Sequence, residues 1–61
     1  MTAQQLQIVR LAAKGLANRQ IAERLLLSDR TIGFHLYQAF PKLGVTSRAQ
    51  LRDALTRLEG A

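Results

Sequence analysis

Arg30, Phe34 and Tyr37 follow one another at helical spacing and combine a guanidinium group with two aromatic rings. At about 100° per residue they share one side of a helix with Gln38, and Gly33 lies at its border. Ordinary solvated helix faces carry Lys and Glu instead. In the DNA major groove, arginine can bridge two acceptors of guanine, an amide can read adenine, and an aromatic ring can contact the thymine methyl group. These five residues are therefore candidates for base contacts, with the glycine permitting close approach.

The same aromatic face has a second interpretation, as the contact surface of a protein-interaction module. Phe34 and Tyr37 would then cover the edge of the core or bind another protein. Binding to DNA releases counterions, so steep salt dependence would favour the first interpretation. Saturable binding to a protein, without affinity for duplex DNA, would favour the second.

The composition argues against catalysis and against a metal site. The chain has no cysteine, one histidine and four acidic residues among its 61, and the acids are scattered along the sequence. A nucleophile with its base, or a metal cage, cannot be assembled from these groups. We therefore expect a protein that is not an enzyme and that uses no cofactor or metal.

The charge balance indicates an anionic partner. Nine Lys and Arg residues against four acidic ones leave a formal net charge of +5. This favours nucleic acid ahead of an anionic membrane, with solubility alone as the remaining explanation. No apolar run reaches the roughly 18 residues of a membrane span, and no signal-peptide pattern opens the chain. Since the lack of cysteine also suits a reducing compartment, we expect a cytoplasmic protein without a membrane partner.

Capping residues and apolar spacing predict four short helices. Thr2 and Gln5 form a capping-box pattern, and Gly15 suits a left-handed helix end. Pro41 is expected to kink the third helix or to end it early, near Ala39. The predicted helices cover residues 3–14, 19–26 with Asn18 as N-cap, 29–43 between Ser28 and Gly44, and 48–58 with Ser47 as N-cap.

The short connections predict an all-α, four-helix domain with a central helix-turn-helix. About two residues separate the second and third helices, which favours a steep crossing over an antiparallel pair and places the helix-turn-helix at about 18–37. A chain this short supports one small core, so a single domain is expected over 1–61. The core face of the third helix is expected to consist of Ile32, Leu36, Ala39 and Leu43.

The segments GLANRQIAERLLLSDRTIGFHL and KLGVTSRAQL resemble the helix-turn-helix output domain of LuxR-type transcriptional regulators. The resemblance runs from Met1 through Ala49 and includes the segment after the third helix. It implies sequence-specific binding of double-stranded DNA for transcription regulation, in the bacterial cytoplasm at the nucleoid, with the helix at about 29–42 in the major groove. It also implies that this chain is the C-terminal part of a longer regulator. The departures from the family's usual residues are Gln5 in place of glutamate, and Gly33, Phe34, Tyr37 and Gln38 in place of polar or basic residues.

Five residues are candidates for contacts to DNA phosphates. Thr31 lies in the first turn of the third helix, although its hydroxyl could instead bond within that helix. Arg19 and Asn18 lie at the positive end of the second helix, although Asn18 could be no more than a cap. His35 is either a phosphate donor or a side chain packed on the turn. The resemblance places Arg48 near the DNA backbone.

In the family that the chain resembles, the fourth helix often forms a dimer contact. Leu51, Leu55 and Leu58 are the candidates for it here, whichever of them the core does not use. A homodimer on DNA is therefore expected, and RNA polymerase is a further partner that the resemblance leaves open.

Overall fold

The helices lie close to where the capping residues place them. The computed structural model describes residues 1–59, in which every regular element is helical. The prediction of an all-α fold is thereby confirmed. The elements are α1 (Ala3–Ala13), α2 (Asn18–Leu25), α3 (Asp29–Leu43), a short 3-10 helix η1 (Arg48–Gln50) and α4 (Leu51–Glu59).

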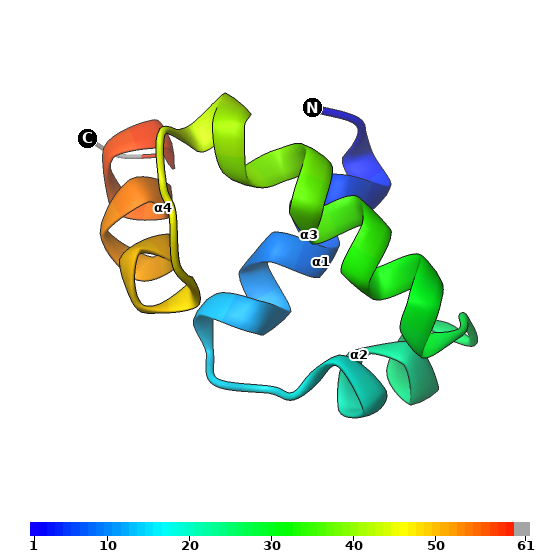
Figure 1. Ribbon diagram of the computed structural model, residues 1–61. Coiled ribbons are helices and arrows are strands. Elements are labelled where there is room, and N and C mark those ends of the chain that lie inside the picture. Colours follow the sequence, from blue (N-terminus) through cyan, green and yellow to red (C-terminus); the bar gives the residue numbers. More distant parts are fainter. Residues whose placement is uncertain (60–61) are drawn as a thin grey trace.

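The longest helix, α3, packs against both α1 and α2, and α1 also packs against α4 (Figure 1). A single core lies among these elements. Ile32, Leu36 and Ala39 of α3 are buried in it as predicted, and Leu43 packs against its edge. The other buried apolar residues are Ile8, Val9, Leu11, Ala12, Ile21, Ala22, Val45, Leu51, Ala54 and Leu55.

The start of α1 confirms one half of the expected capping box. The hydroxyl of Thr2 accepts a hydrogen bond from the backbone N–H of Gln5 at 3.1 Å. The other half was wrong, because the Gln5 side chain does not return to the cap but bonds to α3. At the far end Lys14 is the C-cap, and Gly15 follows with a φ of 99°.

The expected N-cap of α2 was wrong by one residue. Ala17 is the N-cap, and Asn18 is already the first residue of the helix. The cap is stabilised by the side chain of Gln20, whose Oε1 accepts from the backbone N–H of Ala17 at 2.8 Å. The amide of Asn18 is therefore not used as a cap and is available for other contacts.

The turn between α2 and α3 is made by a leucine in a conformation that usually belongs to glycine. Leu26 has φ 59° and ψ 43°, and its side chain is 91% exposed. A left-handed conformation costs a non-glycine residue about 1–2 kcal/mol. The turn ends at Ser28, whose hydroxyl accepts from the N–H of Thr31 at 3.1 Å and caps α3 as predicted. This tight turn sets the position of α3 relative to α2.

Pro41 does not end α3 early, so this alternative was wrong, whereas the predicted bounds of 29–43 are confirmed. The helix continues to Leu43, and Gly44 closes it in the left-handed conformation, with φ 70°. Pro41 costs the last turn one N–H donor. The N–H of Val45 donates to the carbonyl of Phe40 at 3.1 Å. A residue that follows the helix thus satisfies one of the carbonyl groups of its last turn.

The fourth helix begins later than predicted. Ser47 makes no side-chain cap bond, and residues 48–50 form the 3-10 turn η1 instead. Gln50 holds this turn, because its Oε1 accepts from the backbone N–H of Thr46 at 2.7 Å. The regular helix α4 then starts at Leu51.

Candidate nucleic-acid interface

The outward face of α3 carries the exposed aromatic side chains. Phe34 is 56% exposed and Tyr37 is 79% exposed, and Arg30 is exposed on the same side. The opposite face holds Ile32 and Leu36 in the core. The structure therefore confirms that Phe34 and Tyr37 lie outside the core, as their spacing predicts.

His35 lies at the edge of this face, half-buried beside Phe34. The two rings meet edge to face, with centroids 6.0 Å apart and an interplanar angle of 66°. Its Nδ1 atom is buried and has no hydrogen-bond partner within residues 1–59. Both interpretations of His35 in the sequence remain compatible with this position.

Gly33 lies where the start of α2 approaches α3. A Cβ atom built on Gly33 would be 3.6 Å from Nδ2 of Asn18, which is an ordinary van der Waals distance. Asn18 and Gly33, fifteen positions apart in the sequence, are thus neighbours in space. The structure brings a candidate phosphate-contact residue next to a candidate base-contact residue.

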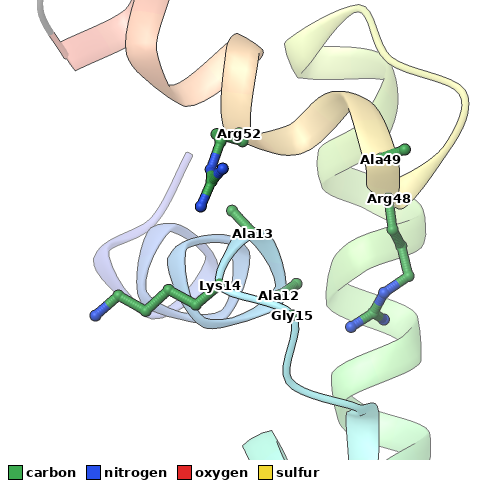
Figure 2. A pocket seen from close by; sticks show the side chains of 7 residues that line it. All are labelled: Ala12, Ala13, Lys14, Gly15, Arg48, Ala49 and Arg52. Atoms are coloured by element: carbon green, nitrogen blue, oxygen red, sulfur yellow. The ribbon is translucent and has the colours of Figure 1, made fainter.

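Arg48 reaches from η1 to the connection between α1 and α2 (Figure 2). Its Nη1 donates to Oδ1 of Asn18 at 2.5 Å, and its Nη2 donates to the backbone carbonyl of Leu16. Hydrogen bonds from a charged donor are stronger than neutral ones. Arg48 therefore ties the start of the fourth-helix segment to the start of α2. It also occupies the acceptor of the Asn18 amide and leaves the Nδ2 donor of that amide facing α3.

The other two candidate phosphate contacts are exposed or half-exposed. Arg19 projects from the first turn of α2, and its Nε is 4.0 Å from the carboxylate of Glu23. Both of these side chains are highly exposed, so this pair contributes little to stability. Thr31 is half-buried, and its hydroxyl lies 2.8 Å from that of Ser28. The alternative of a local bond for Thr31 is thus realised in the structure.

Gln38 is exposed on α3, but its amide has a partner inside the molecule. Its Oε1 accepts from Nε2 of Gln5 at 3.2 Å. Gln5 also accepts from Nζ of Lys42 at 3.4 Å through its own Oε1. Sequence reasoning missed this contact. The signal that could have found it is the spacing of Gln5 with Ile8 and Val9, which puts the amide on the buried side of α1.

Two of the three candidate dimer residues belong to the core. Leu51 is 0% exposed and Leu55 is buried, so the core uses both of them. These two leucines therefore drop out of the candidate dimer contact, which was expected only from leucines that the core leaves free. Leu58 is 56% exposed and remains available.

A shallow hollow of about 420 Å³ lies between the end of α1 and the start of the fourth-helix segment (Figure 2). Lys14, Arg48 and Arg52 line it, together with Ala12, Ala13, Gly15 and Ala49. In Figure 2 Lys14 extends away from Arg48 and Arg52, and the guanidinium of Arg48 is already bonded to Asn18. The charged side chains that line the hollow are thus all positive.

Within residues 1–59, no cluster of three or more His, Cys, Asp or Glu side chains could hold a metal ion. In the same part of the chain, no helix is both long enough and apolar enough to cross a membrane.

Two helices joined by a tight turn, the second of them with a buried face and an exposed face, define a helix-turn-helix domain. A family model described as bacterial regulatory proteins, luxR family, matches residues 1–55. The chain belongs to this family of DNA-binding transcription regulators.

Relatives with known names agree with this assignment. A relative from Mycobacterium tuberculosis, named as an HTH-type transcriptional regulator, is 44% identical over 57 residues, which are 93% of this chain and 6% of the relative. The Fimbriae Z protein of Salmonella typhimurium is 46% identical over 46 residues, which are 75% of this chain and 22% of that protein. The oxygen regulatory protein NreC of Staphylococcus aureus is 37% identical over 51 residues, 84% of this chain and 24% of that protein. The chain thus spans a small part of the curated relatives that it matches. No solved structure gave a significant match.

Proposed function

We propose that this chain reads a specific double-stranded DNA sequence by inserting α3 into the major groove. The observation that carries the proposal is the exposed face of α3, where Arg30, Phe34 and Tyr37 project from a helix whose other side is buried in the core. Arg30 supplies donors for guanine, and the two rings supply apolar contact for thymine methyl groups or sugar edges. The proposed role of the domain is that of the C-terminal, DNA-binding part of a longer regulator that acts in the cytoplasm at the nucleoid.

We propose that groups around the start of α2 and α3 hold the phosphates. The Nδ2 donor of Asn18 remains available because Arg48 binds the other end of that amide. Arg19 adds a positive charge near the N-terminus of α2, where backbone N–H groups also favour anions. Thr31 and His35 flank the outward face of α3 and complete the proposed set. Arg48 contributes by holding Asn18, and its remaining N–H groups lie at the same place.

The test of this proposal is a selection of bound sequences from a random duplex pool, followed by titration of the selected duplex and a scrambled one. The expected result is tighter binding to the selected duplex by at least about a thousandfold for a full site, with affinity falling steeply as salt rises. Binding that ignores sequence and salt alike would contradict the proposal.

Replacing Gly33 with alanine is expected to separate stability from DNA binding. The added Cβ would meet only Nδ2 of Asn18, at 3.6 Å, so it fits in the free domain. Alanine within a helix is favoured over glycine by about 1 kcal/mol, so the melting temperature should rise. Affinity for the selected duplex should fall, because the methyl group holds α3 further from the base edges. A thermal melt and a titration of the same variant measure both effects. An increase in both stability and affinity would show that α3 does not approach DNA closely at Gly33.

We propose that two copies pair on DNA through the exposed part of α4, centred on Leu58. Substituting Leu58 with glutamate should weaken binding to a duplex with two half-sites, because the new charge would face the partner chain. Binding to a single half-site should be unchanged. The control is Thr56→Glu, which adds the same charge to an exposed position about 200° around the helix. Equal loss on both duplexes would exclude pairing through this face.

A further inference from the structure

Gln5 occupies an unusual place for a polar side chain. It is 5% exposed, and within residues 1–59 it is the only polar or charged residue that is buried. It lies on α1, yet both partners of its side-chain amide belong to α3. Buried polar groups are retained at low cost only when they are hydrogen-bonded, and these two bonds meet that requirement.

The direction of both hydrogen bonds follows from Lys42. An ammonium group can only donate, so the atom of Gln5 that faces Lys42 is Oε1, at 3.4 Å. The other end of the same amide, Nε2, then faces Gln38 and donates to its Oε1 at 3.2 Å. Lys42 therefore sets the orientation of the Gln5 amide, and Gln5 in turn sets the orientation of the Gln38 amide.

This orientation decides which atoms Gln38 can present to a ligand. Its Oε1 is turned toward α1 by the bond from Gln5, while its Nε2 keeps both N–H donors. Gln38 is exposed and lies about 40° around α3 from Phe34, on the outward face. Of the two ends of this exposed amide, the acceptor is thus engaged by Gln5, and the donor is the end without a partner within residues 1–59.

We propose that Gln5 is a specificity-determining positioning residue that makes Gln38 a donor of hydrogen bonds to DNA, an inference that rests on the proposed function. Guanine presents only acceptors in the major groove, N7 and O6, and matches this arrangement. Adenine, in contrast, is read by an amide that both accepts from N6 and donates to N7. With Oε1 held toward α1, Gln38 selects guanine over adenine at the base pair that it contacts.

The experiment compares four variants of the chain by sequence selection and by titration of duplexes that differ at one base pair. Gln38→Ala identifies the base pair, because the preference at that pair alone should disappear. Gln5→Glu replaces the amide by a group that only accepts, so Nε2 of Gln38 should turn toward it and Oε1 should turn outward. Lys42 lies beside the new carboxylate and can pair with it. In the parent chain we expect affinity for the duplex with guanine to exceed affinity for the duplex with adenine on the order of tenfold. In Gln5→Glu we expect this ratio to fall to one or to invert in favour of adenine.

Two further variants separate orientation from charge and from folding. Gln4→Glu adds the same charge at an exposed position of α1 and should keep the preference for guanine. Gln5→Met fills a similar volume without either hydrogen bond, and should reduce the preference toward one even if Gln5→Glu does not fold.

The inference would be overturned if the preference at the base pair identified by Gln38→Ala stayed the same in Gln5→Glu and Gln5→Met. A uniform loss of affinity for every duplex would likewise assign Gln5 a structural role alone. The proposed function would survive both results. In contrast, failure of the parent chain to prefer any duplex would overturn the proposed function itself, and the inference with it.

Discussion

Leu51→Ala should lower the free energy of unfolding by about 2–5 kcal/mol, the range expected for truncating a fully buried leucine. The side chain of Leu51 is 0% exposed and belongs to the core cluster. A domain of this size is stabilised by only about 3–5 kcal/mol, so the variant should be largely unfolded near physiological temperature. Circular dichroism during thermal or urea unfolding measures the change.

Leu58→Ala is the matched control for this prediction. It removes the same atoms from the same helix, but at a side chain that is 56% exposed. Surface substitutions of this kind change stability by about 0.5 kcal/mol or less. Equal destabilisation by the two variants would mean that Leu51 is not part of the core that the structure shows.

Phe34→Ala should leave the melting temperature almost unchanged and weaken binding to the preferred duplex by about 1–3 kcal/mol. The ring lies on the outward face of α3, while Ile32 and Leu36 fill the core side. Truncation therefore removes no contact with the core cluster of the free domain. In the proposed complex, the same ring would displace water against a thymine methyl group or a sugar edge, so binding to the specific site should suffer. Nonspecific binding should barely change.

The measurements for Phe34→Ala are a thermal melt and a titration against the selected and the scrambled duplex. Leu26→Ala serves as the control, since it truncates another exposed apolar side chain away from the outward face of α3. A large drop in melting temperature with unaltered specificity would place Phe34 in the core and remove it from the proposed interface.

Much of the fold could be predicted because its signals are local. The hydroxyls of Thr2 and Ser28 cap α1 and α3 where the sequence indicates, and Gly44 ends α3 in the left-handed conformation. The apolar spacing of Ile32, Leu36 and Ala39 identified the buried face of α3. These features depend on neighbours within about one helical turn, so short-range rules are sufficient.

The errors fall where several local solutions compete. Asn18 is a favourable N-cap residue, but Gln20 caps α2 from three residues after Ala17, so the helix starts one residue earlier. Pro41 usually ends a helix, but here it lies in the last turn, where one donor is lost and Gly44 closes the end. Propensity alone does not rank such alternatives, because tertiary packing contributes more than the difference between them.

For the candidate site, the sequence by itself determined which face of α3 is apolar and which is exposed. Successive side chains of a helix are related by a fixed rotation, so the position of one face gives the position of all the others. The tertiary structure decided which residues of one helix contact residues of another. It joined Arg48 to Asn18, set Gln5 against Gln38, and assigned Leu51 to the core while leaving Leu58 exposed. Each of these outcomes depends on how helices distant in the sequence pack together. Local spacing can show that a side chain such as Gln5 faces inward, but it does not show which residue of another helix that side chain meets.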